Sequence, residues 1–237
     1  MKILQVLDEI SKKNISIVSV AKIISSYKFL STNSKIIVSK NIDKRKNIHS
    51  IKSLIGNLFF SSEVSKILKS YKPDLVHIHG IWRPIHLFFM LHCAFLRIPI
   101  IVQPHGMLLK EALKSKSNLS YIIKLLTLNI IYKLLISTSY FIAVTKEEKK
   151  SIEKYFPNAE IAIVRNPIET KKTNIEKIQK KFVYFGRYNS HKNLLEFIEA
   201  FILVASNKKW IFEIYGIEDD NNYKNKLKKL VLSNGFG

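Results

Sequence analysis

Histidine, glycine and basic residues stand at the ends of four segments that the sequence predicts as buried strands. These residues are His79-Gly80, His105-Gly106, Arg165-Asn166 and Gly186-Arg187. Ligands of open α/β sheets bind beyond the carboxyl ends of the strands. Glycine lets the backbone approach a ligand closely, and arginine complements phosphate charge. The pattern predicts a site for an anionic ligand such as a phosphate. Lys192 follows Gly186-Arg187 by a few residues and adds another positive charge to this site.

Each of these residues also has a structural interpretation. His79 and His105 can be turn residues satisfied by backbone carbonyls, while two histidines at neighbouring strand ends give a functional role about equal weight. Gly186-Arg187 can be a tight turn with a solvated cation, and Trp82 can be a packing residue. The residues alone leave both interpretations open.

Two nucleotide-binding motifs are absent from the sequence. No G-x-G-x-x-G follows the first predicted strand, which argues against a dinucleotide-dependent oxidoreductase. No G-x-x-x-x-G-K-[ST] occurs either, which argues against an NTPase of the P-loop class.

The sequence predicts no metal site. We expect His77 and His79 to point to opposite faces of their strand, which argues against paired metal ligation there. The acidic run 218–220 can hold a divalent cation beside a diphosphate or can form a turn that caps the next helix. Cys93 lies in an apolar helical stretch and is expected to be an inert core thiol.

Short apolar runs alternate with segments of helical periodicity along the chain. Strands are predicted over 3–7, 34–39, 75–79, 99–103, 140–145, 161–164, 182–185 and 210–215. Helices are predicted over 16–30, 59–68, 84–97, 118–137, 146–155, 193–205 and 222–232. This alternation is typical of βαβ units, so the sequence predicts a doubly wound α/β fold with a parallel sheet covered on both faces.

The polar segment 169–181 has hardly any apolar residue and is the best linker in the sequence. We therefore predict a first domain over 1–168 and a second over 182–237. The second part has only two predicted strands and two helices, which cannot cover both faces of an open parallel sheet. We expect it to be the first half of a Rossmann-like domain.

The chain has 237 residues and a formal net charge of +21, from 39 Lys plus Arg and 18 Asp plus Glu. Its 47% hydrophobic content is that of a folded chain. No zinc finger, RNP-type run or basic zipper occurs, so we expect no nucleic-acid partner. A solvated lysine-rich surface and contact with an anionic membrane surface both stay open.

The single cysteine excludes an intramolecular disulfide and favours a reducing, cytoplasmic compartment. Asp8 and Glu9 interrupt the first apolar run, so we expect no signal peptide and a chain that starts at its mature end. The apolar window 85–102 contains Arg97 and Pro99 and is rejected as a membrane span. The helix over 121–137 can lie on a bilayer or be a core helix, and we favour the core helix.

Six segments together resemble the retaining glycosyltransferases of the group 1, or family 4, class with the GT-B architecture. They are PDLVHIHGIW (73–82), IPIIVQPHGML (99–109), SYFIAVTKEEKKSI (139–152), IAIVRNPIE (161–169), KFVYFGRYNSHKNLLEFIEAF (181–201) and WIFEIYG (210–216). The most specific block is F-G-R-x-x-x-x-K-N, and the His-Gly pair after IVQP is the second.

The resemblance implies two Rossmann-like domains that face each other across a cleft, with a nucleotide-diphosphate sugar on the C-terminal domain and the acceptor on the N-terminal one. By position, Arg187 and Lys192 resemble the cations that neutralise the departing diphosphate, and His105 resembles the histidine near the transferred sugar. The implied donor-binding residues are Gly186, Arg187, Lys192, Gly106, Gly216 and Asn166. The implied acceptor-side residues are His79, Gly80 and Trp82.

The activity that the resemblance implies is retaining transfer of a sugar to a glycan or lipid-linked acceptor, in polysaccharide or cell-surface glycan biosynthesis. Two fixed cations would stabilise the leaving phosphate without a metal, and no cofactor besides the donor substrate is expected. The implied location is the cytoplasm, with attachment at the inner face of the cell membrane open.

The sequence departs from the pattern of this class at three places. Residues 8–16 read DEISKKNIS without the glycines that many members carry, and Asn166-Pro167-Ile168-Glu169 stands where Asn-Gly-Val-Asp is frequent. The acidic Glu-x7-Glu segment that grips the donor would belong beyond residue 237. The alternative is therefore a truncated, inactive remnant that acts at most as a binding module.

Overall fold

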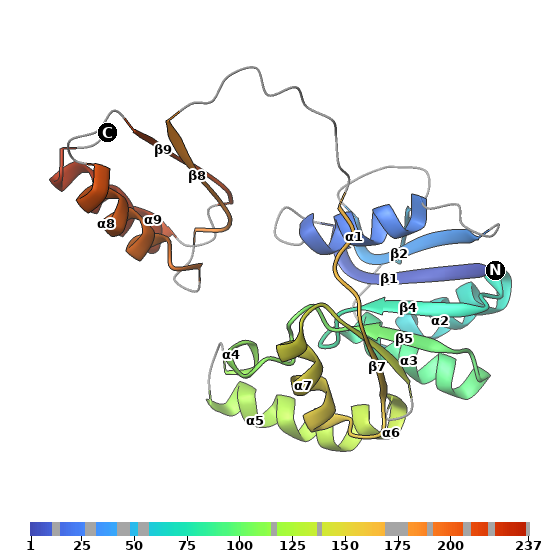
Figure 1. Cartoon of the computed structure of the whole chain (residues 1–237). Coiled ribbons are helices and arrows are strands. Elements are labelled where there is room, and N and C mark those ends of the chain that lie inside the picture. Colours follow the sequence, from blue (N-terminus) through green and yellow to red (C-terminus); the bar gives the residue numbers. More distant parts are fainter. Residues whose placement is uncertain are drawn as a thin grey trace. The chain divides into compact units, whose positions relative to one another are not determined.

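The computed structural model describes residues 1–10, 15–26, 32–41, 48–51, 57–114, 118–136, 139–168, 180–188, 192–205, 210–217 and 221–235. The chain divides into two compact units, Met1–Glu169 and Thr170–Gly237. Most of the predicted linker 169–181 lies outside the described residues. Figure 1 labels the helices and strands of each unit.

The first unit is built on a seven-stranded sheet in which every neighbouring pair is parallel. The order is β3-β2-β1-β4-β5-β6-β7. The strand order reverses between β1 and β4, and this reversal is the point at which doubly wound sheets bind ligands. The strands are β1 (Lys2–Ile10), β2 (Asn33–Asn41), β3 (Ile48–Ser50), β4 (Leu75–His79), β5 (Ile100–Gln103), β6 (Tyr140–Ala143) and β7 (Glu160–Ile163).

Helices connect these strands and begin and end where local chemistry favours it. Pro84 occupies the first turn of α3, and Arg97 ends it in the left-handed region at φ 55°. The Thr145 side chain caps α7 by accepting from the Glu148 backbone N–H at 3.1 Å. The helices are α1 (Ile15–Ser26), α2 (Asn57–Tyr71), α3 (Pro84–Leu96), α4 (Lys110–Leu113), α5 (Asn118–Thr127), the π-helix η2 (Leu128–Tyr132), α6 (Lys133–Ile136) and α7 (Lys146–Tyr155).

Two hydrophobic clusters lie on the opposite faces of the first sheet. Residues of α2, α3, η2, α6 and α7 pack with Leu4, Val6, Val76 and Ile78 in the larger cluster. Residues of α1 pack in the smaller cluster with Leu7 and Val38. Side chains alternate between the two faces along a strand, so Gln5 lies on the same face as Leu7, which α1 covers. His77 pairs with Gln5, and His77 and His79 therefore lie on this face as well.

The described residues of the second unit form a two-stranded parallel sheet and two helices. Strands β8 (Lys181–Phe185) and β9 (Ile211–Tyr215) pair in register, and α8 (Leu194–Ala205) and α9 (Asn221–Ser233) contribute the buried residues Leu194, Ile198 and Leu227. Several apolar side chains of this sheet stay exposed, among them Phe185 at 86% and Val183 at 55%.

The predicted α/β fold with parallel sheets is confirmed. The short elements β3 and α4 were not predicted from the sequence. The segment from α5 to α6 was predicted as one regular α-helix, whereas the structure has the π-helix η2 in its middle. The expected extension of the first helix to residue 30 falls outside the described residues.

Candidate functional site

The predicted site residues of the first unit follow the carboxyl ends of β4 and β5, and Asn166 follows β7. His79 is the last residue of β4, and Gly80 follows it. His105 and Gly106 follow β5, which pairs with β4 so that His79 lies opposite Gln103. The two histidines therefore meet beside the point where the strand order reverses.

A chain of hydrogen bonds joins β1, β4 and the loop after β5. The Oε1 atom of Gln5 lies 2.6 Å from His79 Nε2, and His79 Nδ1 lies 3.0 Å from His105 Nε2. Because an amide oxygen only accepts, His79 Nε2 must donate, and its Nδ1 must then accept from His105 Nε2–H. In this arrangement a neutral His105 carries its proton on Nε2, and its Nδ1 is unprotonated.

Burial keeps these histidines neutral. It lowers the pKa of His105 from 6.5 to about 4. The pKa of His79 is also held well below 6.5, by burial and then by the nearby His77, His105 and His86. At neutral pH the pair therefore offers neutral hydrogen-bonding groups and no cation.

His77 and His79 lie on the same face of β4, and the expectation that they point to opposite faces is wrong. Their ring centroids are 4.1 Å apart. Side chains alternate with a period of two, so residues i and i+2 share a face. Burial and then His105 lower the pKa of His77 to about 4, and this is partly opposed by a hydrogen bond that the His77 ring donates to the Gln103 side chain. Within the described residues, no group of three or more His, Cys, Asp or Glu side chains could hold a metal ion.

His86 on α3 is fully buried next to this chain. Neither of its ring nitrogens has a hydrogen-bond partner among the described residues, and the same is true of Gln5 Nε2 and His77 Nε2. Burial, followed by Arg83 and His105, lowers the pKa of His86 to about 3. Gly80 at φ +111° makes room for this ring, because a Cβ there would stand 2.6 Å from His86 Cε1.

The loop that carries His105 has an unusual backbone. His105 has φ 54° and Gly106 has φ 79°, so two successive residues adopt left-handed conformations. A residue with a side chain pays about 1 kcal/mol or more for this conformation, and such strain is concentrated at functional sites. The surrounding contacts must therefore hold the loop in place.

Glu148 on α7 supplies that support. Its side chain is buried, with 2% exposure. One carboxylate oxygen accepts from Gly106 N–H at 2.6 Å, and the other accepts from Val144 N–H at 2.7 Å. Glu148 thereby ties the loop after β5 to the segment between β6 and α7.

We expect Glu148→Ala to lower the free energy of unfolding by about 3–5 kcal/mol, because it orphans two buried backbone donors and removes a charge-assisted contact. Chemical denaturation followed by circular dichroism measures this loss. Glu147→Ala is the matched control, since Glu147 is an exposed neighbour on the same helix turn, and it should change stability by about 0.5 kcal/mol at most. Equal stabilities of the two variants would contradict the role of Glu148.

Trp82 and Asn166 complete the predicted group in this unit. Trp82 Nε1 donates to the Met107 carbonyl at 3.2 Å, and its ring contacts Tyr132 edge to face with centroids 5.9 Å apart. Asn166 Oδ1 accepts from Gln103 Nε2 at 3.2 Å. These contacts hold the Trp82 side chain in place. Trp82 also lines a cavity, so it can still contact a ligand there.

A cavity of about 310 Å³ opens at this edge of the sheet. Two of the residues that line the cavity, Arg83 and Asp8, form an ion pair, with Arg83 Nε 2.8 Å from Asp8 Oδ2. The polar and aromatic lining residues are Asp8, Glu9, His79, Trp82, Arg83 and His86. Carboxylates, neutral imidazoles and an indole ring can hydrogen-bond and stack on a polyhydroxylated ligand.

The predicted residues of the second unit lie at the ends of β8 and β9. Gly186 N–H donates to the Tyr215 carbonyl at 3.0 Å, and a Cβ on Gly216 would stand 1.6 Å from the Gly186 carbonyl oxygen. Arg187 directly follows Gly186 and is partly exposed, and Lys192 is exposed just before α8. The close approach of the two strand ends therefore requires glycine at position 216.

Some predicted residues cannot be placed. His191, Glu169 and the acidic run 218–220 lie outside the described residues. The role of Cys93 as a core thiol is consistent with its burial, which raises its pKa to about 12.

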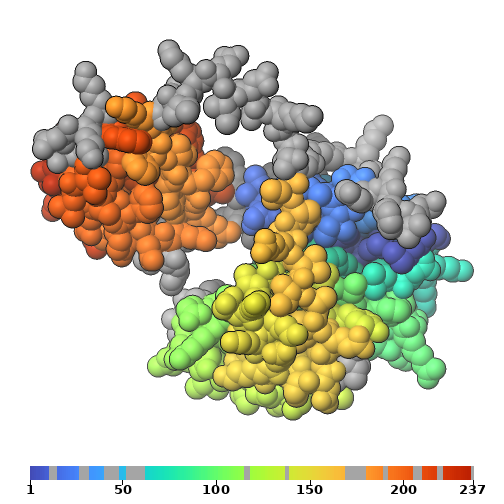
Figure 2. Space-filling model, viewed as in Figure 1, coloured from blue at the N-terminus to red at the C-terminus, as the bar shows by residue number. Residues whose placement is uncertain are grey.

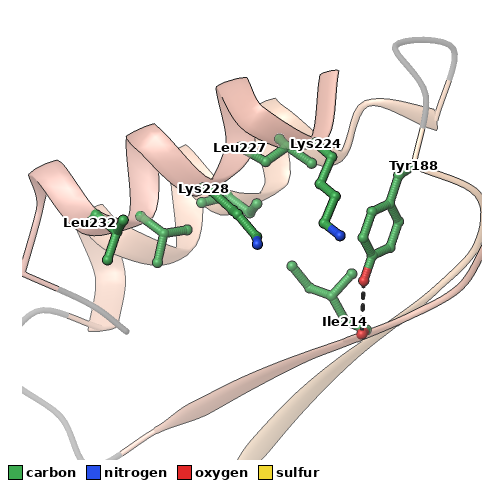
Figure 3. A pocket seen from close by; sticks show the side chains of 8 residues that line it. Tyr188, Ile214, Lys224, Leu227, Lys228 and Leu232 are labelled. Atoms are coloured by element: carbon green, nitrogen blue, oxygen red, sulfur yellow. Dashed lines mark hydrogen bonds between the residues drawn. The ribbon is translucent and has the colours of Figure 1, made fainter. Parts of the chain in front are cut away.

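The second unit also has an apolar cavity of about 590 Å³ beside α9 (Figure 3). Tyr188 and Lys224 border one end of it, and the Tyr188 hydroxyl donates to the Ile214 carbonyl at 3.2 Å. The core residues Ile198 and Leu227 line it, whereas Gly186, Arg187, Lys192 and Gly216 do not. It is an opening in the core of this unit and not the predicted diphosphate site.

The sequence reasoning missed Gln5, His86 and Glu148. Gln5 interrupts the apolar run Ile-Leu-Gln-Val-Leu, and a polar residue inside a buried strand needs a polar partner. Glu148 follows Thr145 by three residues, at the position where a carboxylate is favoured in the first turn of a helix. These two signals were present, whereas nothing in the sequence singles out His86.

The sequence profile described as Glycosyltransferase Family 4 matches residues 35–172, which include β4, β5 and the histidine pair. Among curated proteins, none matches the chain. Solved structures that match the chain have low sequence identity to it and include both glycosyltransferases and UDP-GlcNAc 2-epimerases.

A glycosyltransferase from Rickettsia africae ESF-5 has 17% identity and a TM-score of 0.64, over 98% of this chain and 65% of that one. The lipopolysaccharide outer core galactosyltransferase WaaB has 16% identity and a TM-score of 0.55, over 96% and 65%. A UDP-GlcNAc 2-epimerase from Neisseria meningitidis, bound to UDP-GlcNAc, has 17% identity and a TM-score of 0.58, over 98% and 70%. The chain thus has the Rossmann-like fold of GT-B proteins and spans 65–70% of the length of these three.

Proposed function

Because the chain belongs to glycosyltransferase family 4, we propose that it transfers a sugar from a nucleotide-diphosphate sugar to a hydroxyl group of a glycan or lipid-linked acceptor. We further propose that the transfer retains the anomeric configuration and serves polysaccharide or cell-surface glycan synthesis in the cytoplasm. The donor class is supported by the UDP-GlcNAc bound to the Neisseria meningitidis epimerase, which shares the fold.

The observation that carries the proposal is the buried Gln5–His79–His105 chain within a family 4 unit. It fixes His105 as a neutral imidazole with a lone pair on Nδ1, and a sugar hydroxyl can donate to that atom. The strained loop and its anchor Glu148 hold this group in one orientation. Such preorganisation is what a site needs to stabilise a transition state.

The leaving group is the nucleoside diphosphate, whose β-phosphate gains negative charge as the bond to the sugar breaks. We assign Arg187 and Lys192 to the stabilisation of that charge, without a metal ion. A guanidinium group can hold two phosphate oxygens at once, and an ammonium group adds a second fixed charge. The acceptor is assigned to the cavity at Trp82 and His79, where Gly80 makes room for the His86 ring that also lines the cavity.

A transfer assay on the chain tests this proposal. The chain is incubated with UDP- and GDP-sugars and a lipid-linked sugar acceptor, and the release of nucleoside diphosphate is measured with and without EDTA. We expect release that depends on the acceptor and is unchanged by EDTA. Epimerisation of UDP-GlcNAc without release of UDP would overturn the proposal, and binding without any turnover would favour the inactive remnant.

A further inference from the structure

Helices α5 and α6 and the π-turn η2 form one rod over Asn118–Ile136 whose outer side is apolar. In the most apolar 18-residue window of this rod, only 17% is buried inside the protein. In Figure 1 it runs along the lower border of the first unit, and in Figure 2 its green to yellow-green atoms lie at the surface there. Seven large apolar side chains of the rod are at least 40% exposed, and we call them the apolar stripe: Leu119, Ile122, Ile123, Leu126, Ile130, Ile131 and Leu134.

The apolar stripe is not the side of the rod that packs on the core. Its members lie three or four residues apart or, as in 122–123 and 130–131, side by side, which places them on one broad face of a helix. Leu128, Tyr132 and Ile136 project from the other face and are buried to 2% exposure or less. The expectation of a core helix is therefore wrong for most of this segment, because its more apolar side faces away from the core.

Soluble monomers rarely expose a contiguous apolar surface of this kind unless it binds a partner or a membrane. The charge around the stripe favours an anionic partner. The sequence between Glu111 and Glu147 has no acidic residue and five lysines, Lys114, Lys116, Lys124, Lys133 and Lys146. Lys133 is exposed on the rod itself, and Lys110 and Lys114 are exposed at its N-terminal side.

The rod is long and apolar enough to cross a bilayer, but its attachments oppose crossing. It lies in the connection between β5 and β6, which pair with each other in the sheet. Its inner face is fixed to the core, and the Tyr132 hydroxyl donates to the Ile81 carbonyl. A spanning rod would have to leave this core and separate two paired strands.

We propose that the apolar stripe of α5–α6 docks the protein on an anionic lipid bilayer, with the rod parallel to the membrane plane. Apolar side chains would enter the boundary between headgroups and acyl chains, and the exposed Lys110, Lys114 and Lys133 would contact anionic headgroups. This docking surface is separate from the histidine chain and does not depend on the proposed sugar transfer.

Co-sedimentation with vesicles tests the proposal. The chain is mixed with vesicles of phosphatidylethanolamine and phosphatidylglycerol, and in parallel with vesicles of phosphatidylcholine alone. We expect binding to the anionic vesicles, weakened by salt, and a drop of about ten-fold or more in the partition coefficient for the variant Ile122→Ser/Leu126→Ser/Ile130→Ser. Circular dichroism checks that this variant remains folded, as expected for three exposed positions.

The matched control removes three exposed apolar side chains from the second unit, Leu203→Ser/Val204→Ser/Leu232→Ser, and should bind vesicles like the wild type. Equal binding of the stripe variant and the wild type would overturn the proposal. It would also be overturned if analytical ultracentrifugation without lipid showed a wild-type dimer that the stripe variant abolishes, because the stripe would then be an interface between two copies.

Discussion

Arg187→Ala should lower the rate of sugar transfer on the order of 10²–10³ fold, because the variant loses a fixed charge that the proposed function places at the leaving phosphate. Three hydrogen bonds fix the backbone of residues 186–188. Gly186 N–H donates to the Tyr215 carbonyl and Tyr188 N–H donates to the Ile217 carbonyl, both at 3.0 Å. The Tyr184 hydroxyl donates to the carbonyl of Arg187 itself at 3.3 Å.

Steady-state kinetics of purified variants measure this effect. If the charge acts mainly in the transition state, kcat falls while KM changes little. Lys180→Ala is the matched control, since it removes an exposed cation at the start of β8, and it should retain wild-type rates. Arg187→Lys keeps the charge but loses the planar fork and should fall between the two. Near-wild-type turnover of Arg187→Ala would refute its assigned role.

The strands and helices of the first unit could be predicted because their signals are local. The runs Leu75–His79 and Ile100–Gln103 are mainly apolar, of strand length, and bounded by proline or glycine. The strand β3 has only three residues and no such run, so the pattern could not distinguish it from a loop. The exposure of α5–α6 could not be predicted either, since a helix pattern does not tell which partner covers its apolar side.

The meeting of His79 and His105 followed from topology alone. Both stand at the carboxyl ends of strands that alternate with helices, and neighbouring parallel strands bring such ends together. The contacts of Gln5 and Glu148 needed the three-dimensional structure, because their partners lie 74 and 42 residues away in the sequence. The proximity of His79 and His105 could thus be predicted from the sequence, whereas the residues that fix their protons and the loop of His105 could not be identified.

The histidine cluster should make the first unit sensitive to acid. In the unfolded chain a histidine takes up its proton near pH 6.5. In the folded unit the pKa values of His77 and His105 are lowered to about 4 and that of His86 to about 3. The unfolded state therefore binds more protons below pH 6.5, so the stability contributed by the neutral rings is complete above pH 6.5 and is lost as the pH falls towards 4.

The size of this loss is large for a single domain. Lowering one pKa from 6.5 to about 4 corresponds to roughly 3 kcal/mol per histidine at pH 4. Two or three such groups together reach the total stability of a typical domain, about 5–15 kcal/mol. We therefore expect the first unit to unfold between pH 6.5 and 4, as measured by the free energy of unfolding from denaturant titrations across that range.

His86→Leu tests the origin of this sensitivity. Leucine removes two buried nitrogens that have no partner among the described residues, so at pH 7 the free energy of unfolding should rise by about 1–3 kcal/mol. Between pH 6.5 and 4 the variant should lose less stability than the wild type, because its unfolded state binds one proton fewer. His49→Gln is the control, since His49 is exposed and its replacement should leave the pH profile unchanged. Parallel stability–pH profiles for His86→Leu and the wild type would show that His86 is protonated equally in the folded and unfolded states. The acid sensitivity would then have to arise from the Gln5–His79–His105 chain and His77 alone.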